Sequence, residues 1–522
     1  MYVILLKVSY TGGDGVSDFN LKIKVLPGEN WWGGAVDDGV HMPFGNQNFT
    51  RSLDPNPTDN QAAPFLVSNK GRFVWSNQPF AFSFRDGDLL VNSERAPVRL
   101  YEDYEDLRQA YCAAQKEYFP SEGKIPDPVL FTAPQYNTAV ELMGNQRRET
   151  VLEYAESIIE HKMPPGVIII HEGWQEDFGV WDFHPGRFPD PKGMVDRLHE
   201  LGFKVMLWTS PFVSPDSPAG RELTSKGLLL KEKTGDIVIR LWWNGYSALL
   251  DLTNEETVAW YREQNQRLMD TYGVYGFMFD AGDPGYYRDS DQSAVFSHAS
   301  DHCRWYNKLG LHYPLNMYRA AWKFAGKPLA QCLGNKLHTW DTNGLASLIP
   351  NGLAQGLMGY WFTCSASIGG ADLNEIEPGK IDQELMVRYA QCASLFPMMQ
   401  FSKAPWHLLD EEHIGYCRDA ALLHHKLGDE ILELAKEAAK TGEPMMRHLV
   451  YSFPDGGYEE VRDQFMLGDN ILVAPVVRKG VTVRNIHFPE GTWVGDDGSE
   501  VEGPCSLEVE APLSRLPWYR RK

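Results

Sequence analysis

The chain has 522 residues and a formal net charge of −21, with 49 Lys and Arg against 70 Asp and Glu. This length predicts roughly two to four domains, and the acidic balance argues against nucleic acid or an anionic membrane surface as a partner. Seven scattered cysteines without a Cys-x-x-Cys pair predict reduced thiols rather than a disulfide framework.

The N-terminal apolar run, residues 2–6, is too short for the core of a signal peptide. No apolar run approaches the length of a membrane span. We therefore expect a cytoplasmic protein with no membrane partner, unless a signal peptide has been removed from it. The sequence leaves a homo-oligomer open.

Residues 1–127 are rich in Gly, Asn, Asp and Pro and contain short alternating segments such as 21–25 and 71–75. Alternation of apolar and polar residues is typical of strands with one buried face. We predict an N-terminal β-sandwich over residues 1–127.

From residue 128 the pattern changes to strands that alternate with amphipathic helices. Helical apolar faces lie over 151–159 and 194–201, and eight strands are expected at 136–140, 167–170, 205–208, 276–280, 314–318, 337–340, 359–363 and 398–401. Such alternation builds a parallel sheet covered by helices. Eight strands favour a (β/α)8 TIM barrel over residues 128–435.

After residue 436 the texture returns to short strands, at 463–468, 471–475 and 491–493. We predict a C-terminal β-sandwich over residues 436–522, so the expected fold class is α/β, a barrel flanked by two β-sandwiches.

The segment 275–283 is the most informative stretch of the chain. Phe277 to Phe279 have the length and composition of a buried strand, which stops at Asp280 and is followed by a small-residue turn and Asp283. Catalytic residues of a parallel α/β barrel lie at the C-terminal ends of its strands. The alternative interpretation is that Asp280 caps the next helix.

Polar residues also follow the other predicted strands. His171 and Glu172 follow the second, the third ends in 208–210, the sixth delivers 338–341, and the last two end near Thr363 and Ser402. Two carboxylates beside several Trp suit glycoside hydrolysis, in which one acid attacks the sugar and the other protonates the leaving oxygen.

Competing interpretations of these motifs are weaker. Gln175 occupies the fifth position of a His-Glu-x-x-His motif, which argues against a metal site at His171. Asp341 has the alternative interpretation of a cap, and at least one residue of the pair Trp242–Trp243 is expected to serve ordinary packing. The segment 365–370 matches neither Gly-x-Ser-x-Gly nor a P-loop.

The sequence resembles glycoside hydrolase family 31, the retaining α-glycosidases, from about residue 134 to the C-terminus. The similarity rests on segments that follow one another in the family's order: 182–190, 203–211, 384–388, 464–468, 472–475, 488–493 and 512–517. Within the family, the chain is most similar to the branch that contains the myogenesis-regulating glycosidase and bacterial α-galactosidases, through 240–245, 250–253, 277–283, 347–350, 399–402 and 405–406.

The resemblance implies roles for individual residues. Asp280 matches the family nucleophile, and Asp341, aligned across a small gap, best matches the acid/base. Glu172, Asp251 and Asp283 are expected acceptors for sugar hydroxyls, and Trp174, Trp208 and Trp243 are expected to stack on the sugar. The remaining expected substrate-binding residues are Lys336, Trp340 and Ser402.

The chain departs from the family pattern at several of the implied sugar-binding positions. The departures are Met278 for Lys, Asp283 for Glu, Ser367 for the Asp of Asp-Ile-Gly-Gly, Gln331 or Cys332 for Arg with Lys336 as a substitute, and Ser402 for His. The catalytic pair therefore matches the family better than the specificity residues do.

The expected function is that of a retaining, exo-acting α-glycosidase of the α-galactosidase type, which hydrolyses terminal α-linked sugars by double displacement. The alternatives are an α-glucosidase, α-xylosidase or α-N-acetylgalactosaminidase of the same family, or a catalytically silent sugar-binding protein on this fold. The expected partner is an oligosaccharide or glycoside substrate, and this chemistry requires neither metal nor organic cofactor.

Overall fold

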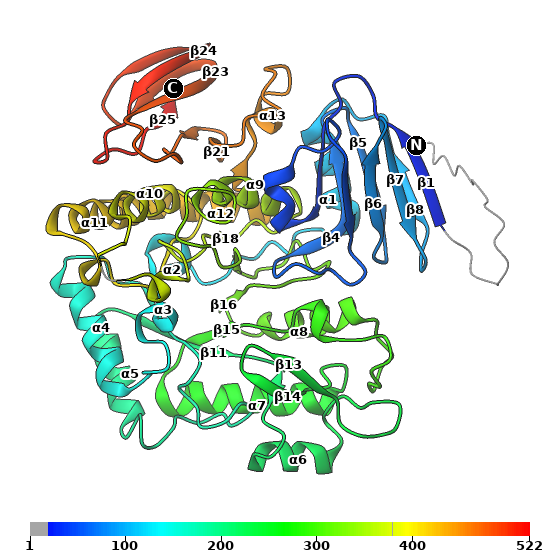
Figure 1. Ribbon diagram of the computed structural model, residues 1–522, viewed down its shortest axis with the longest axis vertical. Coiled ribbons are helices and arrows are strands. Elements are labelled where there is room, and N and C mark those ends of the chain that lie inside the picture. The colour runs from blue at the N-terminus through cyan, green and yellow to red at the C-terminus, as the bar shows by residue number, and fades with distance from the viewer. Residues whose placement is uncertain (1–18, 378) are drawn as a thin grey trace.

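The computed structural model describes residues 19–522 except residue 378, and places them in three regions (Figure 1). The N-terminal region holds two four-stranded antiparallel sheets, which confirms the predicted sandwich. One sheet has the order β1 (Phe19–Lys24), β7 (Asp88–Ser93), β6 (Ala81–Arg85), β3 (Phe49–Ser52). The other has the order β2 (Trp31–Ala35), β4 (Ala62–Ser68), β5 (Arg72–Ser76), β8 (Val98–Tyr101).

The two N-terminal sheets differ in burial. β7 alternates buried and more exposed residues, whereas β2, β4 and β5 are buried along their whole length. The second sheet is buried on both faces because one covers the first sheet and the other lies towards the barrel, where Ala62 bridges Trp322. Helix α1 (Leu107–Tyr118) then leads into the barrel.

The middle region is an eight-stranded parallel sheet, as predicted. Its order is β18 (Thr363–Cys364), β17 (Gln331–Cys332), β16 (Leu315–Tyr318), β15 (Gly276–Phe279), β11 (Lys204–Thr209), β10 (Val167–Ile170), β9 (Gln135–Asn137), β19 (Gln400–Phe401). Parallel bridges from Cys364 to Met398 and from Ile368 to Phe401 bring the two edges together, so the sheet forms a nearly closed barrel.

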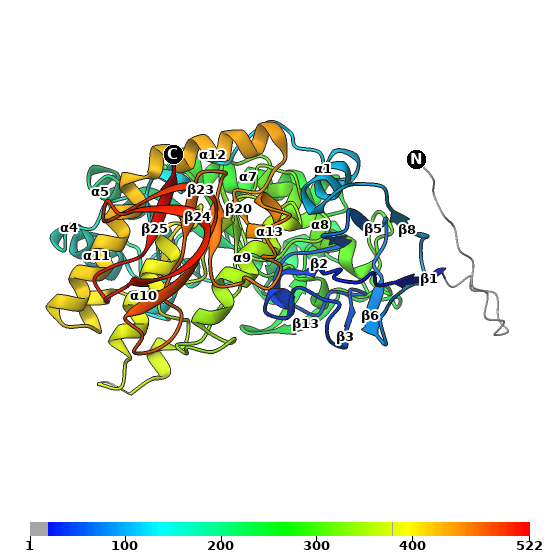
Figure 2. The same cartoon turned by 90° about the horizontal axis from the view of Figure 1, so that it is seen from above.

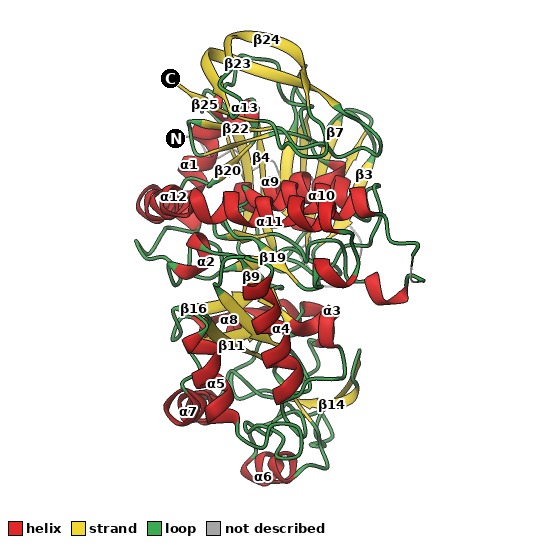
Figure 3. Ribbon diagram, turned by 90° about the vertical axis from the view of Figure 1, so that its left-hand side faces the viewer, coloured by secondary structure: helices red, strands yellow, loops and turns green. Residues whose placement is uncertain are grey.

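Helices cover the outside of the barrel (Figures 1 and 3). They are α2 (Val129–Thr132), α4 (Arg148–Glu160), α5 (Pro191–Glu200), α7 (Glu255–Tyr272), α8 (Ala299–Gly310), α9 (Leu348–Leu357), α10 (Gln383–Ser394), α11 (Glu411–Lys426) and α12 (Gly428–Thr441). The short helix α3 (Thr138–Leu142) instead follows the C-terminal end of β9, and α6 (Pro218–Lys226) belongs to the segment between β11 and α7. The helices expected over 151–159 and 194–201 are α4 and α5. The boundary drawn at residue 435 falls inside α12.

The prediction of the sixth strand was wrong. The structure places this strand at Gln331–Cys332, whereas residues 337–340 form a bend in the loop that follows it. A strand of two residues carries no period-two pattern, so its sequence offered no strand signal. His338 to Asp341 therefore lie well beyond the end of the strand.

A small antiparallel sheet is inserted between β11 and α7. It has the order β12 (Phe212–Val213), β14 (Gly245–Leu249), β13 (Ile239–Trp242). Trp242 pairs with Gly245, so Trp243 and Asn244 form the tip of a two-residue hairpin. Gly245 has φ 89°, a conformation that favours glycine. This hairpin carries Trp243 to the C-terminal ends of the barrel strands.

The C-terminal region is all β apart from the short helix α13 (Leu449–Ser452). Its strands form one six-stranded antiparallel sheet rather than two separate sheets, in the order β20 (Met446–Arg447), β21 (Phe465–Leu467), β22 (Ile471–Val473), β25 (Trp518–Arg521), β23 (Val483–Gly495), β24 (Glu500–Glu510). Figure 2 shows the long β23–β24 hairpin on the side of the molecule where α10 and α11 lie.

All seven cysteines are free thiols. Within residues 19–522, residue 378 aside, no helix has both the length and the apolar character needed to cross a membrane.

Candidate functional site

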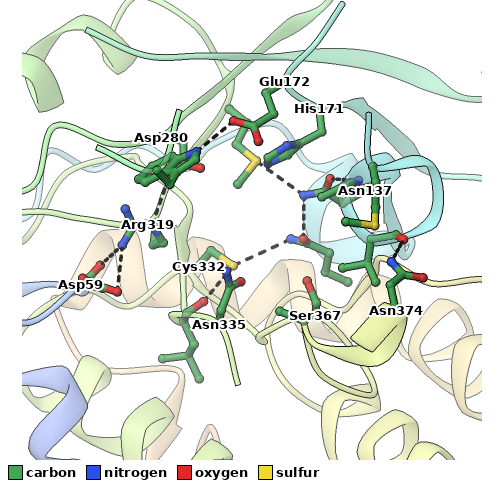
Figure 4. Close-up of a pocket in the computed structure, with 18 of the residues that line it drawn as sticks. Asp59, Asn137, His171, Glu172, Asp280, Arg319, Cys332, Asn335, Ser367 and Asn374 are labelled. Atoms are coloured by element: carbon green, nitrogen blue, oxygen red, sulfur yellow. Dashed lines mark hydrogen bonds and ion pairs between the residues drawn. The ribbon is translucent and has the colours of Figure 1, made fainter. Parts of the chain in front are cut away.

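A cavity of about 410 Å³ opens at the C-terminal ends of the barrel strands (Figure 4). Strands β9, β10, β15, β16 and β17 each deliver their last residue, or the residue after it, to its wall. The polar and sulfur-containing lining residues are Asp59, Asn137, Met143, His171, Glu172, Trp243, Met278, Asp280, Tyr286, Arg319, Cys332, Asn335, Ser367, Asn374 and Gln400.

Asp280 is held firmly at the end of β15. Its Oδ2 accepts a hydrogen bond from Trp208 Nε1 at 2.9 Å, and its Oδ1 accepts from Arg319 Nε at 2.9 Å and from the Ala281 backbone N–H at 2.8 Å. Burial raises the pKa of Asp280, but the charge of Arg319 and these hydrogen bonds outweigh it, so the pKa lies below its usual range. Asp280 is therefore ionised and fixed in orientation.

Arg319 connects Asp280 to two further acids. It follows β16 directly, and its Nη2 donates to Asp283 Oδ2 at 2.9 Å. Its Nη1 donates to the backbone carbonyl of Asp59 at 2.8 Å and lies 3.8 Å from the Asp59 carboxylate. These carboxylates keep the pKa of Arg319 well above its usual value despite burial. Figure 4 shows Asp59, Arg319 and Asp280 along one side of the cavity.

Glu172, His171 and Trp243 lie beside this charged side. Glu172 Oε2 accepts from Trp243 Nε1 at 3.0 Å and from Asn244 Nδ2 at 2.7 Å, so the carboxylate fixes the tip of the β13–β14 hairpin. The Trp243 ring lies 5.7 Å from the Arg319 guanidinium, and 48% of Trp243 is exposed. Burial lowers the pKa of His171, which favours its neutral form.

The structure brings together only part of the predicted site. Asp280, Glu172 and Trp243 line the cavity. Asp283 and Trp208 are not among the lining residues. Asp283 is connected to Asp280 through Arg319, and Trp208 donates its indole N–H to Asp280.

Two of the three predicted stacking residues require correction. Trp174 and Trp208 are fully buried, so no sugar face can reach them. Trp174 Nε1 donates to the Trp208 carbonyl at 2.8 Å, and its ring packs against Phe183. Both residues build the wall behind Asp280 rather than a stacking surface.

Four other expected substrate-binding residues do not line the cavity, because each side chain has a different partner. Asp251 accepts from Thr253 and from the Ala294 N–H. Lys336 lies 3.6 Å from Asp37. Trp340 donates to Asp382, and Ser402 Oγ accepts from the Val140 N–H.

Asp341 is exposed and lies outside the cavity lining. Its Oδ1 accepts from Thr339 Oγ1 and from the Asn343 N–H, both at 2.8 Å, and these bonds lower its pKa. Its loop continues from Leu333 and Asn335, which do line the cavity.

Several residues of the site were missed from the sequence. Arg319 follows the predicted fifth strand directly, and the reasoning used for Asp280 applied to the fifth strand would have found it. Asn137 is the last residue of the short strand β9, whereas Gln400 is the first residue of β19, a position that this rule does not indicate. Asp59 comes from a loop of the N-terminal region, far away in sequence, and no local pattern indicated it.

No cluster of three or more His, Cys, Asp or Glu side chains with the arrangement of a metal site occurs in the described part of the chain.

Comparison with known families identifies the chain. The model of the "Glycosyl hydrolases family 31 TIM-barrel domain" matches residues 134–432, and the "Glycosyl hydrolase family 31 C-terminal domain" matches residues 442–522. The chain belongs to glycoside hydrolase family 31. Asp280 at the end of β15 thus lies within the family's barrel domain.

Curated relatives of this family 31 chain include the myogenesis-regulating glycosidase of Mus musculus, 32% identical over 78% of this chain and 58% of that protein. Alpha-xylosidase XylQ of Lactiplantibacillus pentosus is 26% identical over 83% of this chain and 61% of the enzyme. The chain therefore spans about three fifths of these relatives. A Flavobacterium johnsoniae GH31 dextranase complexed with glucose shares the fold, with a TM-score of 0.84 at 21% identity, over 98% of this chain and 67% of that chain.

Proposed function

We propose that this protein is a retaining α-glycosidase that removes a terminal, neutral sugar. The observation that carries the proposal is the ionised, immobilised Asp280 in the wall of a sugar-sized cavity at the C-terminal ends of the barrel strands. Oδ1 of Asp280 accepts two hydrogen bonds and Oδ2 accepts one. Oδ2 therefore keeps a lone pair and is the atom that we expect to attack the anomeric carbon.

The reaction has two displacement steps. Asp280 attacks the anomeric carbon while a general acid gives its proton to the departing aglycone oxygen, which leaves a β-glycosyl ester. Water then attacks that ester, the same group now takes the water's proton, and the α-anomer of the sugar leaves. Asp341 remains the proposed acid/base and must approach the cavity through a change in its loop. Glu172, which already lines the cavity, is the second candidate.

The charge of the cavity favours a neutral sugar. Among its described lining residues, three carboxylates (Asp59, Glu172 and Asp280) face the single guanidinium of Arg319. A sulfonated or carboxylated sugar would meet net negative charge there. We propose an α-galactoside first, and an α-glucoside, α-xyloside or N-acetyl-α-galactosaminide as the alternatives. A preference for galactose below ~10-fold over its glucose epimer, about 1.4 kcal/mol, would remove the galactoside assignment.

The decisive experiment is proton NMR of the first-formed product from an aryl α-glycoside. Retention releases the α-anomer, and the β-anomer would refute the mechanism. Asp280→Ala should lower kcat by at least about 10⁴-fold, and azide should then give the β-glycosyl azide. The acid/base variant, Asp341→Ala or Glu172→Ala, should instead give the α-glycosyl azide, because azide attacks the glycosyl-enzyme. Binding of a sugar without turnover of any α-glycoside would support a silent sugar-binding protein.

A further inference from the structure

The side of the cavity opposite Arg319 is neutral and unusually rich in sulfur. It holds Asn137 at the end of β9 and Gln400 on the neighbouring β19, and the sulfur-containing lining residues Met278 and Cys332 contact these two amides. Figure 4 shows Asn137 and Asn374 across the cavity from Asp59 and Arg319. Asn137 and Gln400 are 3% and 1% exposed. Their amide groups therefore have little access to bulk water and must form their hydrogen bonds within the cavity wall.

A backbone contact at Asn137 and the bond between the two side chains fix how these amides are oriented. Asn137 Oδ1 accepts from the Ala139 N–H at 3.0 Å, at the start of α3. Its Nδ2 must therefore point towards Gln400, and it donates to Gln400 Oε1 at 3.1 Å. Each amide oxygen thus already accepts one hydrogen bond within the cavity wall, and the only oxygen acceptor that the N–H groups of the pair contact among the described residues is Gln400 Oε1.

Among the described residues, the remaining N–H groups of the pair contact only sulfur atoms. Asn137 Nδ2 lies 3.6 Å from Met278 Sδ, and Gln400 Nε2 lies 3.5 Å from Met317 Sδ, 3.8 Å from Cys332 Sγ and 3.6 Å from Cys364 Sγ. Sulfur is a weak hydrogen-bond acceptor. A buried amide donor gains from exchanging such a partner for an oxygen.

We propose that Asn137 and Gln400 are specificity-determining residues that together donate hydrogen bonds to one oxygen of the terminal sugar, a hydroxyl or an acetamido carbonyl. This inference rests on the proposed function, because it places the sugar in the same cavity as Asp280. It also goes beyond it, since it assigns the recognition of one sugar oxygen to the N–H groups of this amide pair, on the side opposite the charged residues. When the sugar lacks that oxygen, the N–H groups keep their weak sulfur acceptors, and such a sugar should be a poorer substrate.

The test compares the best α-glycoside substrate with its monodeoxy analogues. In the wild type, removal of one particular oxygen should lower kcat/KM by about 10-fold or more. In Gln400→Met, which keeps the side chain's length without its donor, the same removal should cost less than about 3-fold. The matched control is Gln135→Met, because Gln135 also donates to Cys364 Sγ but lies outside the cavity lining. It should keep the wild-type penalty.

A second variant tests the proposal independently if Gln400→Met does not fold. Asn137→Asp keeps the acceptor for the Ala139 N–H and removes the amide donor, and it should abolish the same deoxy penalty. If either variant lowers kcat/KM equally for the parent and every deoxy analogue, the pair is structural and the proposal is overturned.

The proposal can also survive failure of the catalytic assignment. If no glycoside is hydrolysed, binding of the methyl α-glycosides of galactose, glucose, xylose and N-acetylgalactosamine is measured by calorimetry. Affinity that falls in Gln400→Met and is retained in Gln135→Met supports recognition by the pair without catalysis. Equal affinity in the wild type and both variants, or no binding of any of the four probes, overturns it.

Discussion

At the scale of single residues, Asp283 shows what burial does to a carboxylate. Its Oδ2 accepts from Arg319, whereas its Oδ1 has no hydrogen-bond partner among the described residues. Burial raises the pKa of Asp283 to about 6; Asp59 and Asp280 add to this effect, and Arg319 opposes it. The folded protein therefore binds this proton more tightly than the unfolded chain does. Protonation of Asp283 therefore stabilises the folded state. This contribution is complete below the pKa of the unfolded chain and is lost as the pH rises through about 6.

Asp283→Asn should consequently become more stable relative to the wild type as the pH rises. At pH 4 the wild-type side chain is protonated in the folded state, so the two proteins should have similar Tm. At pH 7 the variant avoids a buried charge worth about 2–3 kcal/mol and should have the higher Tm. Thermal unfolding at pH 4, 5, 6 and 7 measures the difference.

The control for this measurement is Asp270→Asn on the exposed face of α7. Its Tm difference from the wild type should not change in the same pH range. A loss of stability in Asp283→Asn that grows from pH 4 to pH 7 would show that the ionised Asp283 is favoured by Arg319 more than burial disfavours it.

At the scale of elements, the two tryptophans of the β13–β14 hairpin have different roles: one packs in the interior and the other borders the site. Trp242 is 5% exposed and stacks on Phe212 with ring centroids 4.3 Å apart. Trp243 follows it at the tip, half exposed, with its indole N–H tied to Glu172. The short turn reverses the chain after Trp242, so that Trp243 borders the cavity.

Trp243→Ala should raise KM by about 5-fold and leave kcat and Tm nearly unchanged. An exposed aromatic ring beside a sugar contributes about 1 kcal/mol of contact that is the same in the ground and transition states. Steady-state kinetics on the best α-glycoside and a thermal scan measure both quantities.

Trp242→Ala is the matched comparison on the same hairpin. Truncation of this buried ring should cost about 3–5 kcal/mol of stability. Equal effects of the two variants on Tm, or an unchanged KM in Trp243→Ala, would contradict the division of roles.

At the scale of the whole molecule, the N-terminal region completes the site. Gln61 is fully buried between the second N-terminal sheet and the barrel. Its Nε2 donates to the Arg319 carbonyl at 2.8 Å, to Gln331 Oε1 at 3.0 Å and to the Cys332 carbonyl at 3.2 Å. Its Oε1 accepts from Gln355 Nε2 at 2.7 Å. One side chain thus links β16, β17 and α9 to the loop that carries Asp59.

Gln61→Leu should lower the free energy of unfolding by about 2–4 kcal/mol. Leucine preserves the volume but removes the hydrogen-bond partner of Gln331 Oε1 and of Gln355 Nε2, each at a cost of about 1–3 kcal/mol unless the groups relax. Urea denaturation measures the loss. Gln266→Leu, at an exposed position of α7, should change stability by less than about 0.5 kcal/mol. A similarly small effect at Gln61 would show that the contact between the regions does not depend on these bonds.

Much of the fold could be predicted from local patterns. The switch from alternating strands to strand–helix alternation and back indicated the three regions, and the apolar run before Asp280 indicated a barrel strand with an acid at its end. Strands and helices carry periodic signals because one face of each is buried. The sixth strand, Gln331–Cys332, was missed because two residues are too few for a period.

Tertiary structure alone decided the composition of the site. The burial of Trp174 and Trp208, the pairing of Lys336 with Asp37 and the exposure of Asp341 depend on contacts between distant segments. Local sequence patterns and the ordered family motifs were enough to indicate a family 31 barrel with Asp280 at a strand end. Which side chains surround Asp280 was decided by packing, because hydrogen bonds and burial depend on where distant strands and the N-terminal loop meet, and no local period records that.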